Sequence, residues 1–173
     1  MTETLLLRAL SVSDEQDARA AHRELADSGF EFVLGLDEAP SWPALLESLE
    51  RERTGRDLPP GRVPATFLVA VVGDRIVGRL SVRHRLNAYL AEVGGHIGYA
   101  VRPAARRRGY ATEILRAGLR VAADQGVACA LVTCDDDNVG SATVIERCGG
   151  VLRDTVDVDG TRKRRYDVPT APA

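Results

Sequence analysis

Hydrophobic residues along the chain follow two kinds of spacing, and the change comes after a proline-rich loop over 58–65. Before the loop, a short apolar run and then apolar positions at helical spacing predict one strand followed by two helices. Their expected ranges are 4–10 for the strand, 13–29 for the first helix and 41–55 for the second. Ser13 with Gln16 has the pattern of a capping box at the start of the first helix. Ser41 with Pro43 in the first turn indicates the start of the second helix.

The part of the chain after the loop is dominated by strands. Two hairpins are predicted, with turns at Gly73-Asp74 and Asp159-Gly160, because a two-residue turn of this type suits the twist of paired strands. Between the hairpins, single strands are expected to alternate with helices. The predicted elements are strands 66–72, 75–85, 96–101, 128–134, 151–158 and 162–168, helices 110–125 and 139–148, and a polar loop over 86–95.

This order of elements predicts a mixed α/β fold. A single helix lies between strands 96–101 and 128–134, which gives one parallel crossover inside a mostly antiparallel sheet with helices on both faces. We expect a single domain over 1–173, because the segment before the proline-rich loop is too small to fold alone, and a frayed tail over 169–173. In a layered fold of this kind, a ligand is expected where strand ends meet helix N-termini.

Composition then limits the classes of function. The 173 residues, of which 45% are hydrophobic and 28% charged, suit one globular domain that needs no disulfide or metal to fold. A net charge of −2 argues against bulk attraction to nucleic acid, and no apolar run is long enough for a membrane span. Cys129, Cys134 and Cys148 lack paired spacing, which is typical of reduced thiols. We therefore expect a cytoplasmic protein with no nucleic-acid or membrane partner and no metal.

The most informative segment is the turn between strand 96–101 and the helix that starts at 110. It contains three arginines and a glycine, Arg106 to Gly109, and leads directly into the helix. Such a turn directs successive backbone N–H groups outward at the positive end of the helix, which suits a pyrophosphate. Gly109 and Ala111 are small enough for phosphate oxygens to approach the backbone, and the arginines add charge-assisted contacts.

This turn resembles the acyl-CoA loop of the Gcn5-related N-acetyltransferase (GNAT) superfamily, which reads Gln/Arg-x-x-Gly-x-Gly/Ala. Arg106-x-x-Gly109-x-Ala111 fits that pattern. The apolar strand 128–134 and Asn138-x-x-Ser141 at the start of the next helix follow in the superfamily's order. The longer string around 96–111 is similar to a bacterial subgroup of predicted acetyltransferases. The resemblance is good over 66–168 and holds only in general order before it.

The resemblance implies a GNAT-like acyl-CoA N-acyltransferase fold, with acetyl-CoA as co-substrate and a primary amine of a small molecule as acceptor. It implies that 66–168 binds the acyl-CoA and that 1–65 forms the acceptor side. A homodimer would follow the habit of the superfamily. The implied acetyl-CoA contacts are the β-like backbone of one strand, the pyrophosphate turn and the start of the next helix. These residues are Tyr99, Ala100, Val101, Arg106, Arg107, Arg108, Gly109, Tyr110, Ala111, Thr112, Asn138 and Ser141.

Acyl transfer from sulfur to an amine requires a base for the amine's proton and an acid for the departing thiolate. His96 and Glu92 are the candidate bases, and His96 has the better chemistry because a histidine titrates near neutral pH. An ordinary structural role for His96 is the alternative. The superfamily's usual acid is a tyrosine on the helix after the fifth strand, where this chain has Ile145. Tyr166, Tyr99 or water would then take that role.

Two functions of other classes stay open. The missing tyrosine favours a non-catalytic acyl-CoA-binding or sensor domain, which would bind CoA without turnover. The arginine clusters favour a nucleic-acid-associated module, whose binding would depend on salt and not on CoA. The acidic run 135–137 suggests a metal loop, but the glycine and distal glutamate of a calcium loop are missing, and a helix cap at Asn138 explains the run better. The sequence leaves open whether the acceptor is a metabolite, an antibiotic, a peptide or a protein.

Overall fold

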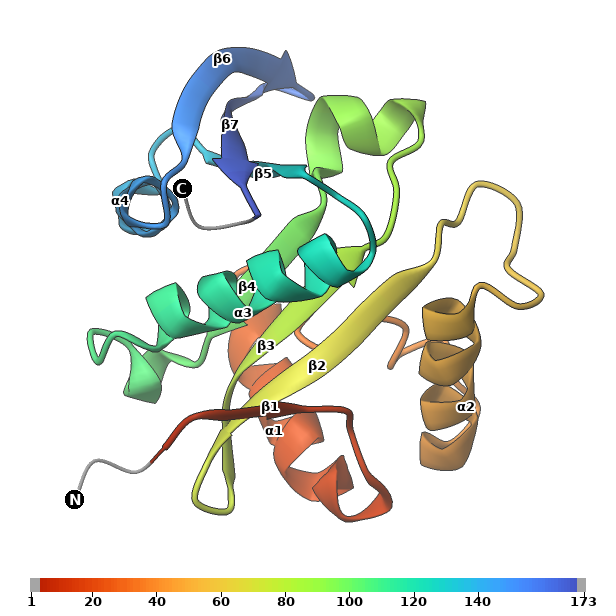
Figure 1. Ribbon diagram of the computed structural model, residues 1–173. Coiled ribbons are helices and arrows are strands. Elements are labelled where there is room, and N and C mark those ends of the chain that lie inside the picture. Colours follow the sequence, from red (N-terminus) through yellow and green to blue (C-terminus); the bar gives the residue numbers. More distant parts are fainter. Residues whose placement is uncertain (1–3, 171–173) are drawn as a thin grey trace.

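The computed structural model describes residues 4–170 and shows a seven-stranded sheet with helices on both faces (Figure 1). The strand order is β1-β2-β3-β4-β5-β7-β6, and all neighbours are antiparallel except β4 with β5. This confirms the predicted mixed sheet with one parallel crossover. The elements are β1 (Leu6–Arg8), α1 (Glu15–Ala26), α2 (Trp42–Thr54), β2 (Ala65–Val72), β3 (Arg75–Arg83), β4 (Ile97–Val101), α3 (Tyr110–Asp124), β5 (Cys129–Asp135), α4 (Val139–Arg147), β6 (Val151–Val158) and β7 (Thr161–Pro169).

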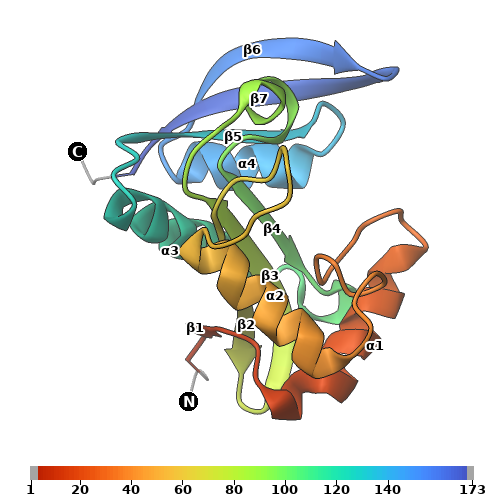
Figure 2. The same ribbon diagram turned by 90° about the vertical axis from the view of Figure 1, so that its right-hand side faces the viewer.

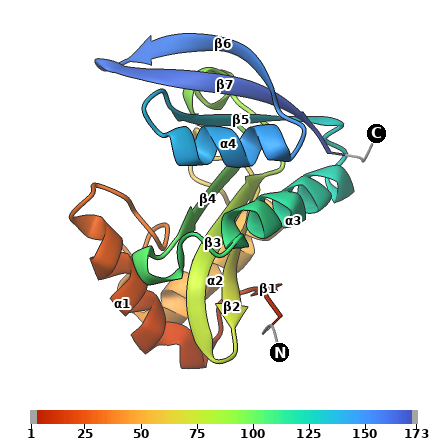
Figure 3. The same ribbon diagram turned by 90° about the vertical axis from the view of Figure 1, so that its left-hand side faces the viewer.

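The two faces of the sheet carry separate apolar clusters. Helices α1 and α2 cover one face and α3 and α4 the other, as the opposite views in Figures 2 and 3 show. Trp42 of α2 and Val69 of β2 lie in the first cluster, whereas Ile114 of α3 and Leu80 of β3 lie in the second. Because helices cover both faces of the central strands, the side chains on both faces of these strands are buried. No helix within residues 4–170 is long and apolar enough to cross a membrane.

The start of the chain differs from the expectation. The first strand is only three residues long, and α1 begins at Glu15 rather than Ser13. The expected Ser13–Gln16 cap is wrong. A 3₁₀ turn over Val12–Asp14 precedes α1, and Ser11 caps this turn by donating from both N and Oγ to Asp14 Oδ2, each at 2.7 Å. Asp14 also accepts from Arg8 of β1 at 2.6 Å. An interaction with the preceding strand therefore decides where the helix begins.

The segment 86–95, expected as an irregular loop, contains a π-helical turn over Leu90–Gly94. Asn87 Oδ1 accepts from the N–H of Leu90 at 2.9 Å and starts the turn. Gly95 ends it with φ of +64°, and a Cβ there would lie 2.5 Å from the carbonyl oxygen of Leu131. A glycine is therefore required where this turn contacts β5, shortly before β4 begins.

Candidate active site

The turn before α3 has the geometry of an anion site. Gly109 has φ of +86° and Arg107 has φ of +65°, so the chain bends sharply before the first residue of the helix. Within residues 4–170, none of the five backbone N–H groups of 107–111 donates to a backbone or side-chain acceptor. The hydrogen bonds of α3 begin with Thr112 and Glu113, which both donate to the carbonyl of Gly109. Free N–H groups at the positive end of a 15-residue helix suit a pyrophosphate.

The arginines of this turn leave its positive charge unbalanced. Arg106, Arg107 and Arg108 are exposed, and none of them forms an ion pair with another residue of the described chain 4–170. Arg106 Nε donates to the carbonyl of Val101 at 3.2 Å, which attaches the turn to the end of β4. Exposed guanidinium groups beside free N–H groups are suited to a multiply charged phosphate ligand.

The strands β4 and β5 separate beside this turn. Ile97 and Val132 are their one parallel pair in the register, and the N–H of His96 donates to Leu131 at 2.7 Å just before it. Beyond Ile97 the strands diverge, as Figures 2 and 3 show, while β4 stays paired with β3 through to Val101. The backbone of 99–101 therefore faces a gap in the sheet on its β5 side.

Tyr99 crosses this gap toward the start of α4. Its hydroxyl lies 2.8 Å from Ser141 Oγ, and burial raises its pKa to about 12. Asn138 caps α4 by accepting from the N–H of Ser141 at 3.0 Å, as the sequence indicates. Tyr99 thus lies beside the start of α4, which is 42 residues away in the sequence at Ser141. Tyr110, Ala111 and Thr112 occupy the half-buried first turn of α3.

The ring of His96 is held by the neighbouring strand. Its Nδ1 accepts from the N–H of Leu131 at 2.9 Å, so in the neutral ring the proton lies on Nε2. Burial, with a smaller contribution from Arg83, lowers the pKa of His96 below its usual value. The ring is therefore neutral at pH 7 and offers a donor at its second nitrogen. To act as a base there, it would first have to release the bond to Leu131.

The other two candidates for proton transfer lie in different surroundings. Glu92 is exposed on the π-helical turn. Tyr166 of β7 is fully buried in the core, and its hydroxyl donates to Glu146 Oε1 at 3.0 Å. Burial raises the pKa of Tyr166. Ile145, which occupies the position of the family's usual tyrosine, is also fully buried. Of the two tyrosines, Tyr99 is the one that faces the gap.

The acidic run at the end of β5 is neutralised by the basic run of β7. Asp135 pairs with Lys163 at 2.5 Å and Asp136 with Arg164 at 2.7 Å. Arg165 pairs with Asp154 of β6 at 2.6 Å. Within residues 4–170, no three His, Cys, Asp or Glu side chains are arranged to hold a metal ion. The three ion pairs therefore connect β5, β6 and β7.

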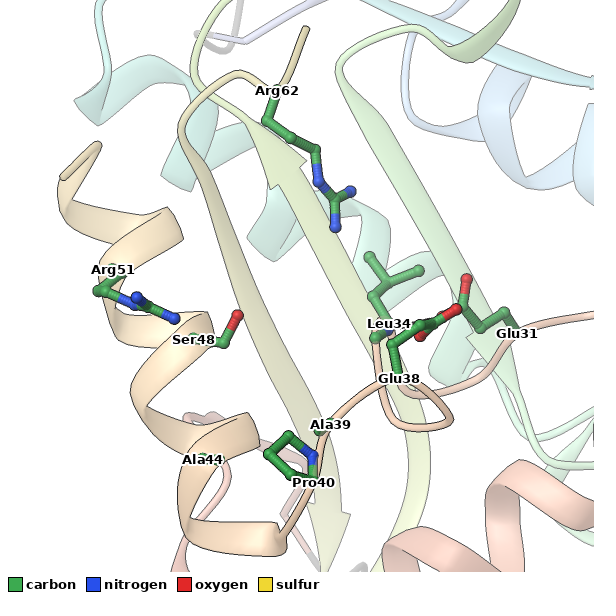
Figure 4. Close-up of a pocket in the computed structure, with 10 residues that line it drawn as sticks. Glu31, Leu34, Glu38, Ala39, Pro40, Ala44, Ser48, Arg51 and Arg62 are labelled. Carbon is green, nitrogen blue, oxygen red and sulfur yellow. Dashed lines mark hydrogen bonds between the residues drawn. The ribbon is translucent and has the colours of Figure 1, made fainter. Parts of the chain in front are cut away.

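A cavity of about 600 Å³ lies on the α1/α2 face and is not indicated by any sequence motif (Figure 4). One wall is the loop before α2, with Glu31 and Glu38, and the other wall is α2 with the following loop, including Arg51 and Arg62. The lining residues are Glu31, Leu34, Gly35, Glu38, Ala39, Pro40, Ala44, Ser48, Arg51 and Arg62.

Comparisons with known proteins agree with this architecture. The acetyltransferase (GNAT) domain family matches residues 4–151. A mycothiol acetyltransferase from Streptomyces scabiei (strain 87.22) is 34% identical over 135 residues, which cover 72% of this chain and 42% of the relative. The chain therefore spans less than half the length of that curated relative.

Solved structures share the fold at low sequence identity. RimJ from Mycobacterium smegmatis, solved in complex with CoA-disulfide, is 22% identical with a TM-score of 0.68, over 97% of this chain and 83% of RimJ. YncA from Salmonella typhimurium, solved with its cofactor acetyl-CoA, is 13% identical with a TM-score of 0.65, over 98% and 95% of the two chains. With the family match extending over most of the sequence, including the turn before α3, the chain belongs to the GNAT family of acetyltransferases.

Proposed function

We propose that the protein is an N-acetyltransferase that moves the acetyl group of acetyl-CoA to a primary amine of a small molecule. The observation that carries the proposal is the turn before α3, where five free N–H groups and three unpaired arginines lie beside the open edge of β4. These groups fit the pyrophosphate of CoA in number and charge. The match to the acetyltransferase family supports the same chemistry.

Within this proposal, each implied residue has a task. The backbone of 107–111, with Arg106 to Arg108, would hold the pyrophosphate, and Thr112 would add a hydroxyl. The free edge of Tyr99, Ala100 and Val101 would pair with the pantetheine arm and present an N–H to the thioester oxygen. Asn138 and Ser141 would border the arm where α4 begins.

Bound acetyl-CoA supplies an activated thioester, and its transfer forms an N–C bond and breaks a C–S bond. One proton must leave the amine and one must reach the sulfur. Tyr99, which faces the gap with Ser141 as its hydrogen-bond partner, is placed to donate toward the sulfur. His96 and Glu92 are the groups we propose for the proton on the amine side, and His96 would act after releasing Leu131. Tyr166 is held by Glu146 and is the less suited acid.

The cavity on the α1/α2 face supports a small-molecule acceptor. Its volume of about 600 Å³ lies in the range of small-ligand sites. All of its lining residues belong to 31–62, which supports the assignment of 1–65 to the acceptor side and of 66–168 to the acyl-CoA core. The mycothiol named in the relative's description is also a small molecule, although the chain covers only 42% of that relative.

Calorimetric titration with acetyl-CoA tests the proposal, with dephospho-CoA as a comparison ligand. We expect saturable binding that Gly109→Glu weakens by roughly 100-fold, because a carboxylate would replace free space beside the phosphates. Gly126→Glu is the matched control at the other end of α3. Gly126 also has positive φ, +80° against +86°, and nothing lies within 4 Å of its Cβ position. The two variants therefore share the same backbone strain.

The outcomes separate the functions that the sequence left open. Binding followed by thiol release with an amine confirms the enzyme. Binding without turnover on any amine of a broad library would indicate an acyl-CoA sensor. If acetyl-CoA does not bind up to millimolar concentration, or if both glycine variants bind it equally well, the turn is not a phosphate site.

A further inference from the structure

The α1/α2 face of the sheet contains a buried arginine with very few partners. Arg79 lies in the middle of β3, opposite Val69 of β2 and Ala100 of β4. It is only 6% exposed, and its Nε has no hydrogen-bond partner. Within residues 4–170 no carboxylate lies within ion-pair distance of it. The interior of the protein thus holds a cation without a counter-ion.

Arg79 makes one long hydrogen bond and one contact with an aromatic ring, and neither neutralises its charge. Its Nη2 donates to the carbonyl of Glu31 at 3.4 Å, near the upper limit for a hydrogen bond. Its guanidinium carbon lies 4.7 Å from the centre of the Phe30 ring. Burial, with a smaller contribution from Arg83, lowers its pKa to about 10. Since an apolar residue would fill this position without the cost of burying a charge, the charge calls for a functional explanation.

The guanidinium contacts a residue of the cavity wall on one side and β4 on the other. On one side it contacts Glu31, which lines the cavity. On the other side its Nη1 lies 3.6 Å from the position that a Cβ of Gly98 would occupy. Gly98 directly precedes the segment 99–101 proposed to hold the thioester arm. Arg79 does not itself line the cavity, so an anion reaches it by displacing the carbonyl of Glu31, and then lies beside Gly98 and the segment proposed to hold the thioester.

The cavity walls carry opposite charges (Figure 4). Glu31 and Glu38 lie on one side, and Arg51 and Arg62 on the other. Arg51 forms no ion pair within residues 4–170, and Arg62 has a long one, 3.8 Å to Glu52. A small molecule that complements both walls has a positive and a negative group.

We propose that the acceptor is a zwitterion, an amine that also carries an anionic group only a few bonds away, with an α-amino acid as the simplest case. This inference rests on the proposed function. Arg79 exchanges its long bond with Glu31 for the anionic group, while Arg62 adds charge at the cavity wall. The glutamates of the opposite wall attract the ammonium form.

The short spacing within the acceptor follows from the position of Arg79 beside Gly98. With the anion on the guanidinium, an amine two or three bonds away lies next to β4, whereas a longer molecule would carry its amine past the strand. The amine loses a proton to a base, its nitrogen bonds to the acetyl carbon, and the sulfur leaves and takes up a proton. Carboxylate and phosphate share the required charge and geometry.

The test uses matched pairs of acceptors with the whole protein. The pairs are α-amino acids with their carboxamides, and 2-aminoethylphosphonate, a phosphate analogue with the amine three bonds from phosphorus, with ethylamine. Thiol release and equilibrium binding are measured for each member. We expect kcat/KM at least about 100-fold higher for the anionic member of a pair. The two kinds of pair distinguish carboxylate from phosphate.

Variants then test the role of Arg79. Arg79→Met loses the preference for the anionic member of each pair, while its affinity for acetyl-CoA is kept and its melting temperature does not fall. Arg75→Met, at an exposed position of the same strand, is the matched control and keeps the preference. Arg62→Gln, on the exposed cavity wall, lowers kcat/KM only for the anionic member of each pair, by roughly 10-fold. This variant tests the inference if Arg79→Met does not fold.

Each outcome decides the inference. Equal rates within the pairs, or an unchanged preference in both Arg79→Met and Arg62→Gln, overturn it. Failure of every pair to bind or react, in a protein that binds acetyl-CoA, also overturns it and leaves acetyl-CoA binding intact. If the unsubstituted protein does not bind acetyl-CoA, the proposed function fails, and this inference fails with it.

Discussion

His96 has two possible roles, as a base in acetyl transfer and as a structural link between β4 and β5. Its Nδ1 accepts from Leu131 and thereby joins β4 to β5 where they begin to separate. The same bond leaves Nε2 as the nitrogen that faces other partners. Asparagine provides an oxygen at the place of Nδ1 but has nothing at the place of Nε2, so it can separate the two roles.

We expect His96→Asn and His96→Ala both to lose turnover, by roughly 100-fold, because both lack the second nitrogen. Only His96→Ala should lose stability, by about 1 kcal/mol, since it leaves the Leu131 N–H without its acceptor. Turnover, acetyl-CoA titration and urea unfolding of both variants measure this. Full turnover in His96→Asn would show that the ring only joins the strands.

The pH dependence of the same residue follows from its surroundings. Burial lowers the pKa of His96, so the folded ring takes up a proton only below its usual value near 6.5. If the neutral ring is needed, kcat/KM stays constant from pH 7 down to that value and falls below it. His96→Asn should lack this acid limb in its residual activity.

Among the helices and strands, the close approach of α3 to the sheet sets the position of the turn proposed to hold the pyrophosphate. Gly118 lies at the contact, and a Cβ there would come within 2.8 Å of Leu80 Cδ1 in β3. The absence of a side chain at Gly118 therefore lets the helix lie directly on β3 and β4. The N-terminus of α3 and the end of β4 are joined by only a short turn, so the position of the helix sets the position of the turn.

Gly118→Val should cost about 2 kcal/mol of unfolding free energy, because the branched side chain forces the helix away from Leu80. Acetyl-CoA binding should weaken along with stability, because the turn moves with the helix. Ala123→Val, at an exposed position of α3, is the control and should change stability by less than about 1 kcal/mol. Equal melting temperatures of the two variants would mean that the packing of α3 is loose.

For the whole molecule, the ion pair of Arg8 and Asp14 connects the edge strand β1 to the start of α1. Arg8 donates to both oxygens of Asp14, at 2.6 and 2.8 Å, and lowers the pKa of Asp14 to about 2. A lowered carboxyl pKa stabilises the fold wherever the unfolded carboxyl would be ionised. This contribution is complete above about pH 4 and is lost as the pH falls to about 2.

Asp14→Asn should therefore lower the unfolding free energy by roughly 1–2 kcal/mol at pH 7, with allowance for the partly exposed Arg8. Near pH 2 it should make almost no difference. Asp27→Asn, an exposed carboxylate with no ion pair within residues 4–170, is the control. Urea unfolding at both pH values measures the effect, and a destabilisation that does not depend on pH would contradict the ionic explanation.

Features that depend only on neighbouring residues were predictable from the amino-acid sequence. The turn before α3 was predictable because Arg106 to Ala111 are consecutive, and Gly109 at the start of the helix has no side chain that could cap its first N–H groups. The N-cap at Asn138 was predictable for the same reason. The parallel pairing of β4 with β5 was predictable because a single helix connects the two strands.

The tertiary structure decided everything that depends on residues far apart in the chain. Arg79 is 48 residues from its contact at Glu31, and His96 obtains its tautomer from Leu131, 35 residues away. Tyr166, a candidate acid in sequence, lies in the core because β7 is inserted between β5 and β6. The turn proposed to hold the pyrophosphate depends on the spacing of a few consecutive residues. The shape of the proposed acceptor site and the protonation of its groups arise only when separate strands and loops pack together.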